Sequence, residues 1–161
     1  GWAYTADPFL SKEDVDRAGE LLNRAIESEP YFQKPIDTIS VVIDVNGENI
    51  LFLDEGVSFI DVMPPKDAWR VHDTYFIVSR TSADISALDA PERAVALHEA
   101  YGEHHELPSA VVRAVYEIAG ALIQAPYRKM VGREDLSAKY ADFIRRRSDD
   151  LEQMLTQNVG N

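Results

Sequence analysis

A chain of 161 residues, of which 45% are hydrophobic and 27% charged, has the size and composition of one globular domain. Its formal net charge of −12 argues against a protein that grips nucleic acid, because an acidic surface repels phosphates. The absence of cysteine excludes disulfides and thiolate zinc sites, and no apolar run approaches the roughly 20 residues that a membrane span needs.

The first predicted element is a helix over residues 11–29, preceded by an arm at residues 1–10. Ser11 can cap the helix, and Asp14 stands near the capping-box position. Apolar residues then recur at helical spacing as far as Ile26, and Pro30 ends the pattern because the residue before a proline leaves the α region.

The middle of the chain has the alternation of β-strands. We predict strands over residues 39–45, 50–53, 57–63 and 74–79. Asn46-Gly47 between the first two is a strong hairpin signal, because both turn positions need a positive φ. These four segments predict an antiparallel meander. Residues 93–101 are ambiguous from the residues alone, since they are rich in alanine but also alternate like a strand.

The last third is predicted to be helical. Pro108 suits a first helical position, and an apolar stripe runs from Val111 to Ile123, ending before Pro126. After a basic linker, an amphipathic pattern predicts a final helix to residue 155, followed by a flexible polar tail at 156–161. The expected fold class is therefore α+β: a single domain over residues 11–155, in which a small helical bundle packs with a meander of about four to five strands.

Charge is unevenly distributed along the chain. Residues 1–127 hold 22 acidic against 9 basic side chains, whereas residues 128–161 hold 7 basic against 6 acidic ones. The basic residues near the C-terminus are candidate contacts with an acidic partner or with a neighbouring copy; the alternative is a solvated face. These candidates are Arg128, Lys129, Arg133, Arg145, Arg146 and Arg147.

We find no residue set in the sequence that predicts catalysis or a cofactor. Metal binding would have to draw on His72, His98, His104 and His105, but adjacent histidines point apart and no HExxH spacing is present. The chain also has no nucleophile elbow, no dinucleotide fingerprint and no phosphate-binding loop. The sequence therefore predicts a protein that is not an enzyme.

Three stretches resemble the head–tail connector, or adaptor, proteins of tailed bacteriophages. Residues 15–26 (VDRAGELLNRAI) resemble the opening helix of that family, and residues 49–63 (NILFLDEGVSFIDVM) its central strand pair. Residues 101–123 (YGEHHELPSAVVRAVYEIAGALI) resemble its aromatic-Gly ending, polar turn and Pro-led helix. In the family the segment before the aromatic-Gly is a strand, so the resemblance implies a fifth strand at 93–101.

The resemblance also implies a function. Such proteins form a ring, usually of twelve copies, in the virion neck beneath the portal protein and above a downstream neck or tail-completion protein. They assemble in the host cytoplasm, away from membranes, and genomic DNA passes through the ring without specific binding. By position, the portal-facing tail would comprise Leu151, Met154, Leu155, Val159 and Asn161.

Two other functions stay open at this point. A small metal-dependent or carboxylate-based hydrolase would need a pocket that collects His98, His104 and His105. An acidic regulatory module would instead bind a basic partner by mimicking the charge of phosphates. For the connector function, reversing the charge of Arg145, Arg146 and Arg147 should weaken ring assembly.

Overall fold

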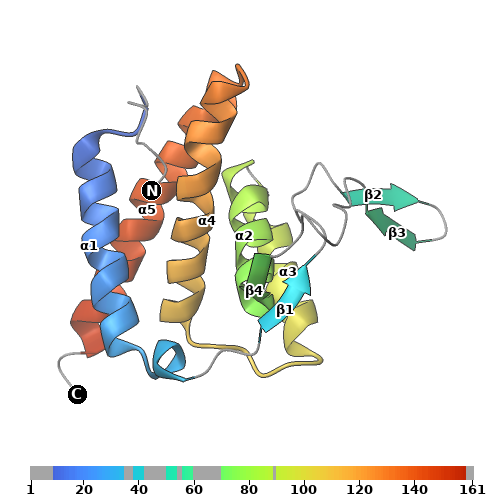
Figure 1. The fold of residues 1–161 in the computed structure, drawn as a ribbon, viewed down its shortest axis with the longest axis horizontal. Coiled ribbons are helices and arrows are strands. Elements are labelled where there is room, and N and C mark those ends of the chain that lie inside the picture. The colour runs from blue at the N-terminus through green and yellow to red at the C-terminus, as the bar shows by residue number, and fades with distance from the viewer. Residues whose placement is uncertain are drawn as a thin grey trace.

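A computed structural model describes residues 9–34, 38–41, 50–53, 56–59, 70–88 and 90–158. Five α-helices build the body of these residues, with one 3-10 turn and four short strands between them (Figure 1). In chain order the elements are α1 Lys12–Ser28, η1 Pro30–Gln33, β1 Thr38–Val41, β2 Ile50–Leu53, β3 Gly56–Phe59, β4 Arg70–Asp73, α2 Thr74–Ala87, α3 Pro91–Gly102, α4 Ala110–Met130 and α5 Glu134–Asn158.

The centre of the bundle is α4, which packs against α1, α2 and α5, while α3 packs on α2. Helices α4 and α5 form an antiparallel pair joined by a short turn at Gly132, whose φ of 78° lies in the left-handed region that favours glycine. Figure 1 shows α1 beside this pair and α2 on the other side of α4. None of the helices in the described part of the chain is long and apolar enough to cross a membrane.

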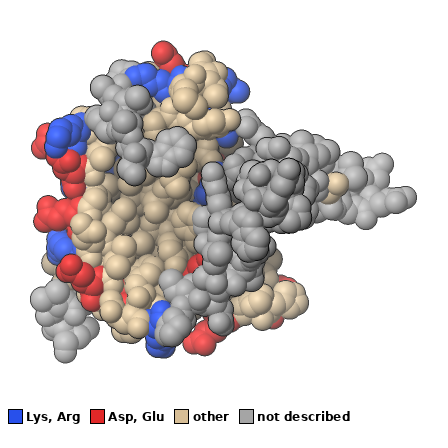
Figure 2. All heavy atoms as spheres, in the orientation of Figure 1, with Lys and Arg blue, Asp and Glu red and all other residues tan. Residues whose placement is uncertain are grey.

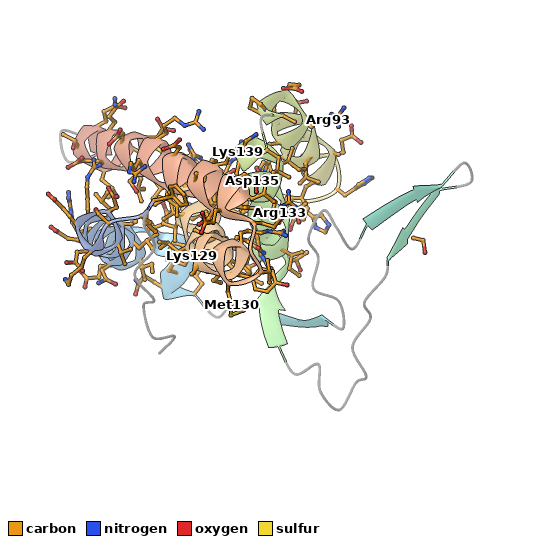
Figure 3. The ribbon with its side chains drawn as sticks, turned by 90° about the horizontal axis from the view of Figure 1, so that it is seen from above. Arg93, Lys129, Met130, Arg133, Asp135 and Lys139 are labelled. Carbon is orange, nitrogen blue, oxygen red and sulfur yellow. The ribbon has the colours of Figure 1, made fainter. Side chains whose placement is uncertain are left out.

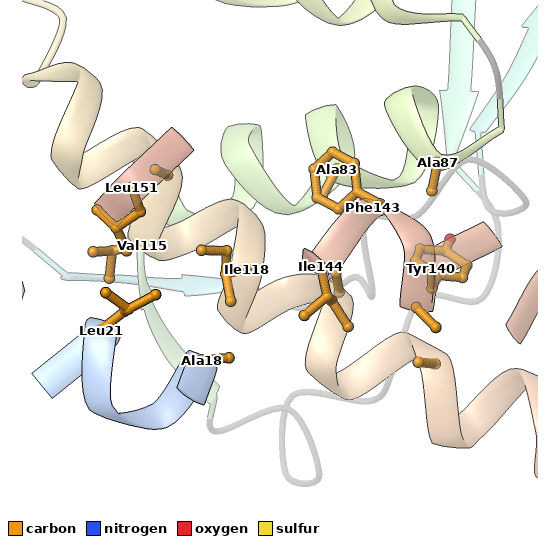
Figure 4. Packing of buried hydrophobic residues seen from close by; sticks show 14 of the residues in the cluster. Ala18, Leu21, Ala83, Ala87, Val115, Ile118, Tyr140, Phe143, Ile144 and Leu151 are labelled. Atoms are coloured by element: carbon orange, nitrogen blue, oxygen red, sulfur yellow. The ribbon is translucent and has the colours of Figure 1, made fainter. Parts of the chain in front are cut away.

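The core lies where α1, α2, α4 and α5 meet (Figure 4). Large side chains such as Leu21, Ile118 and Ile144 interdigitate there with small ones such as Ala18, Ala83 and Ala121, so that the helix backbones approach closely. Ile118, Tyr140, Ile144 and Leu151 are at most 1% exposed, and Ala18 and Ala83 are completely buried. The small residues therefore set how near the flanking helices lie to the central pair.

The predicted α+β fold is wrong: the architecture is all-α. The short strands form two separate two-stranded ladders, β1 with β4 and β2 with β3, both antiparallel, and not one meander. The expected strand at 57–63 is described only as Gly56–Phe59, and the hairpin at Asn46-Gly47 lies outside the described residues. Figure 1 shows β2 and β3 apart from the helices, so they contribute nothing to the core described above.

Residues 74–79, predicted as a strand, begin helix α2. Asp73 caps this helix, since its carboxylate accepts a hydrogen bond from the Tyr75 backbone N–H at 2.8 Å. The buried positions Tyr75, Ser79 and Ala83 then recur every four residues, which places them on one face of a helix. The β-branched and aromatic content of six residues indicated a strand, but the helical spacing continues beyond them and tertiary packing decides the outcome.

Residues 93–101 are also helical, against the fifth strand that the family resemblance implied. Pro91 occupies the first turn of α3, where its missing N–H costs nothing. Ala94 and His98, four residues apart, are its two buried positions. Burial of this narrow stripe against α2 explains why the alanine-rich segment follows its helix propensity.

The other helices were predicted with errors at their ends. The capping box of Ser11 and Asp14 at the start of α1 is confirmed. Helix α4 begins one residue beyond its cap Ser109, so Pro108 is not a helical residue, and it continues through Pro126 to Met130. The final helix α5 is confirmed but extends to Asn158, so that the first half of the expected flexible tail is helical.

Residues 1–8 of the expected arm and 159–161 of the tail lie outside the described residues. The last two arm residues belong to the folded body instead, because Leu10 is only 2% exposed and Phe9 packs against the core.

Helix α2 lies close to α4 at Gly120, which predicts opposite effects of two glycine substitutions. A Cβ at Gly120 would lie 3.2 Å from the Cα of Arg80, whereas nothing lies within 4 Å of one at Gly19. We expect Gly120→Ala to destabilise the fold by about 1–3 kcal/mol through overpacking. The control Gly19→Ala should stabilise it by up to about 1 kcal/mol, because alanine favours the helix. Urea unfolding followed by circular dichroism measures both, and equal gains would contradict the close approach.

Candidate functional site

The most concentrated set of charged groups in the described residues surrounds Glu117, a carboxylate 2% exposed at the middle of α4. Ser82 Oγ donates to Glu117 Oε1 at 2.8 Å, and Arg113 Nε donates to the same oxygen at 2.9 Å. Arg147 Nε donates to Oε2 at 2.7 Å. Both carboxylate oxygens are thus satisfied by groups from α2, α4 and α5, which is what a buried charge requires.

A histidine and a tyrosine extend this network into α3 and α2. His98 Nε2 lies 3.4 Å from Glu117 Oε1, and His98 Nδ1 lies 3.2 Å from the Tyr75 hydroxyl. The order carboxylate, imidazole, hydroxyl is that of an acid–base relay. However, Tyr75 is 2% and His98 4% exposed, so neither group meets a substrate in this conformation. The arrangement serves the packing of four helices and leaves no reacting atom at the surface.

The network holds Glu117 in its charged form. Burial alone would raise its pKa, but the His98 imidazole and the positive charges of Arg147 and Arg113 outweigh the burial, so the pKa falls to about 2. A carboxyl whose pKa is lower in the folded than in the unfolded state stabilises the fold above its unfolded pKa.

A second carboxylate, Asp73, joins β4, α2 and α4. Besides capping α2, it accepts hydrogen bonds from the hydroxyls of Tyr116, at 2.7 Å, and Tyr31. Burial, together with donation to Asp73, raises the pKa of both phenols. The two phenols therefore stay protonated and act as donors; the rings of Tyr31, Phe32 and Tyr116 also contact one another edge to face.

A third carboxylate, the buried Asp84, is bound by the hydroxyl of Tyr140 at 2.8 Å, and burial together with the Asp84 charge raises the pKa of that tyrosine. Arg128, one of the predicted contact residues, is only 6% exposed, and its guanidinium lies 5.7 Å from the centre of the Tyr127 ring. Arg128 thus lies in the interior of the bundle and does not form a surface that a partner could contact.

The structure separates the three consecutive arginines of α5. Arg147 binds buried Glu117 and also Asp150, while Arg145 bridges Asp14 of α1 and Asp142 and donates to the Phe9 carbonyl. Of the three, Arg146 alone is exposed; it donates weakly, at 3.4 Å, to the carbonyl of Asp142. Two of these three candidate contacts are therefore committed within the chain.

The remaining candidates divide in the same way. Lys129 and exposed Arg133 lie at the α4–α5 turn, where Arg133 pairs with Asp135 at 3.3 Å. Of the portal-facing candidates, Leu151 and Leu155 are buried in the core and Met154 packs against it. Val159 and Asn161 lie outside the described residues.

The predicted histidine cluster is not brought together in the described part of the chain. His98 faces the core, whereas His104 and His105 are exposed beyond the end of α3, with His105 stacked on Tyr101. Of the fourth candidate, His72, only the backbone in β4 is described. No group of three or more His, Asp or Glu side chains within residues 9–34, 73–88 and 90–158, where side chains are described, could hold a metal ion.

A groove of about 500 Å³ lies at one end of the bundle, away from the Glu117 network. The end of α1, the start of α4 and the end of α5 form it. It combines apolar and charged side chains and is lined by Arg24, Glu27, Ser28, Glu29, Pro30, Val111 and Leu155. Glu29 also accepts a hydrogen bond from Ser109, the cap of α4, at 2.8 Å.

Sequence reasoning missed Glu117. One signal was present: a single acid sits in the middle of the apolar stripe from Val111 to Ile123, with Arg113 one turn before it. A charge on the buried face of a helix must find partners, so this position predicts a buried ion pair.

Comparisons of the chain with protein-family models, curated proteins and solved structures found no match.

Neutralising Glu117 should destabilise the protein strongly. In Glu117→Gln the guanidinium groups of Arg113 and Arg147 lose their counter-charge, and we expect a loss of about 3–5 kcal/mol. The matched control is Glu152→Gln, which removes an exposed partner of Arg17 and should cost less than about 1 kcal/mol. Urea unfolding at neutral pH measures both; a similar small loss in each would contradict the central place of Glu117.

The lowered pKa of Glu117 predicts a specific acid sensitivity. The stabilisation is fully present above its ordinary pKa of 4.5 and is lost as the pH falls from there to about 2. We expect about 3 kcal/mol of stability to disappear in this window. The difference in unfolding free energy between the wild type and Glu117→Gln should shrink over the same window. A difference that does not change with pH would contradict this prediction.

Proposed function

We propose that this protein is a structural subunit that assembles through its outer helical face, and that it forms an oligomeric ring of a phage neck. One observation carries the assembly role: a long strip of α4 faces outward yet is uncharged, on a chain of net charge −12. Figure 2 shows uncharged atoms over α4 between charged residues at the edge of the body. The strip consists of Ala119, Leu122, Ile123, Pro126, Tyr127 and Met130.

The strip is exposed although it is largely apolar. Ile123 is 51%, Tyr127 47% and Met130 71% exposed. These residues are spaced by four and three positions, so they lie along one line of the helix. Contiguous apolar surface of this kind on a soluble domain marks an interaction site. Burying the strip against another protein removes apolar area from water, which stabilises the complex by about 25 cal/mol for each Å² buried.

The groups that could do chemistry support the same proposal. Glu117, His98 and Tyr75 form the one relay-like arrangement seen in the described residues, and all three are buried. The hydrolase alternative needed a pocket shared by His98, His104 and His105, whose side chains are not brought together. A structural role requires only that these polar groups hold the bundle together.

The neck ring is the specific form that the sequence resemblance implies. The Pro-led helix of residues 101–123 corresponds to α4, which carries the uncharged strip. The helical state of residues 93–101 departs from the strand implied by the resemblance, so this segment gives the proposal no support. In this role, subunits would join portal to tail around a channel whose acidic wall lets DNA slide. A virion neck would be the place of action, reached by assembly in the host cytoplasm.

The experiment produces the chain alone and together with the products of its neighbouring genes, and images the particles by electron microscopy. We expect rings, and we expect Ile123→Asp to abolish them because it places a charge in the strip. Leu88→Asp is the matched control, since Leu88 is equally exposed, at 47%, but lies at the end of α2. A chain that stays monomeric with every neighbour, or that pairs only with a basic partner, would favour the acidic regulatory module instead.

A further inference from the structure

The uncharged strip of α4 lies in the half of that helix nearest the α4–α5 turn. Its three most exposed side chains are Ile123, Tyr127 and Met130. Figure 3, which looks onto this end of the bundle, shows Met130 on the side of α4 away from α5. Such a surface is stabilised when another apolar group removes it from water. An apolar segment of the same chain that can reach the strip is therefore expected to bind it.

The sequence contains such a segment immediately before the described part of the chain. Residues 1–8 read GWAYTADP and carry one charged side chain, Asp7, on a protein with a formal net charge of −12. Trp2 and Tyr4 are large aromatic side chains, and each can bury roughly 150–250 Å² against an apolar surface. The segment is thus as poor in charge as the strip.

The body of the protein holds the end of this segment near the strip. Phe9 packs against the core and its carbonyl accepts a hydrogen bond from Arg145 of α5, while Leu10 is buried. Helices α4 and α5 are antiparallel, and Arg145 follows Gly132 by as many residues as Ala119 precedes it. Phe9 is therefore held near the level at which the strip begins. Figure 1 shows the start of α1 and the end of α4 towards the same end of the bundle.

The segment is long enough to cover the whole strip. The strip extends about 17 Å along the axis of α4, and a helix is about 10 Å wide. Eight extended residues span roughly 26 Å. The chain that leads into β4 is placed less well, because the hydrogen bond between Tyr116 and Asp73 holds its end beside α4 before the strip begins. Residues 1–8 are thus the better placed of the two segments.

We propose that residues 1–8 fold back over the uncharged strip of their own chain and cover it until a neighbouring subunit displaces them; this control of assembly rests on the assembly role proposed above. Trp2, the aromatic residue further from Phe9, reaches the end of the strip at Met130, whose sulfur is a favourable partner for a ring. The tether favours the strip of the same chain, because it holds the segment there at a millimolar effective concentration. A second copy in solution is far more dilute.

Limited digestion with chymotrypsin, which cleaves after aromatic residues, measures the cover in the full chain. Cleavage after Tyr4 requires the segment to leave the strip, so its rate follows the fraction of open chains. We expect Ile123→Asp to speed this cleavage at least about tenfold, because the variant loses the burial of a large apolar side chain. Mass spectrometry gives the rate, and circular dichroism checks that each variant is folded.

Two controls make this digestion specific. Leu88→Asp places the same charge on a side chain that is equally exposed, at 47%, but lies at the end of α2, and it should leave the cleavage rate unchanged. The cleavage rate of the wild type should also be the same in dilute and in concentrated protein, because the cover forms within one chain.

Association measures the control that the cover exerts. In sedimentation, the double variant Trp2→Ser/Tyr4→Ser should associate at least about tenfold more tightly than the wild type, as expected if at most about one chain in ten is open. Tyr4→Phe keeps the aromatic ring and should leave the association constant unchanged.

The outcomes separate the cover from the assembly role. Equal cleavage rates in the wild type, Ile123→Asp and Leu88→Asp overturn the cover, and so does protection that grows with concentration, which would assign the segment to a second copy. In both cases the assembly role stands if Ile123→Asp still abolishes association. A confirmed cover on a chain that never associates, even in the double variant and with every neighbouring gene product, overturns the assembly role and the control of it.

Discussion

The fold depends on a carboxylate that four helices share. Glu117 sits on α4, and its partners come from α2, α3, α4 itself and α5. A buried carboxylate is costly unless every partner is present, so the helices can hardly rotate or slide relative to one another without losing a charge-assisted bond. Tyr140 bound to Asp84 and the two phenols bound to Asp73 tie the same helices together at other levels.

This constraint decides which side chains reach the surface. With Arg147 drawn inward to Glu117, Arg145 turns towards α1 and Arg146 points outward. The inward placement of Val115, Ile118 and Glu117 also leaves the opposite side of α4 outward. That side is the uncharged strip, which α1 and α2 flank and do not bury. The interacting ionisable side chains therefore lie inside the bundle, where they stabilise the fold. The outer face of α4 is suited to contacts with other chains.

Local sequence signals were sufficient to predict secondary structure where a single helix end or a single helix face determined it. The capping box of Ser11 and Asp14 and the apolar stripe of α4 could be predicted because neighbours in sequence are also neighbours in space. The helical state of residues 74–79 could not be predicted, because the Asp73 cap and packing along the whole of α2 outweigh the β-preference of these side chains. Pro126 was taken as a helix end, but α4 continues to Met130, and Ser137 donates to the Ala125 carbonyl beside it at 2.9 Å.

The candidate site was harder to predict than the fold. Glu117 and Arg113 could be paired from their spacing on one helix, but Ser82, His98 and Arg147 come from elements distant in sequence. The arginine run was recognised as charged, yet which arginine turns inward depends on the rotation of α5 about its axis. The groove depends on three helix ends meeting, and no local pattern contains that information.

The central claim is that the buried charges serve stability and the outer face serves assembly. Native mass spectrometry of the purified protein over a range of concentrations tests it most directly, since it reports both the number of copies and any bound ligand. The account predicts discrete oligomers, growing with concentration and carrying no added mass beyond the chains. A monomer that retains a stoichiometric metal ion or small molecule at every concentration would contradict it.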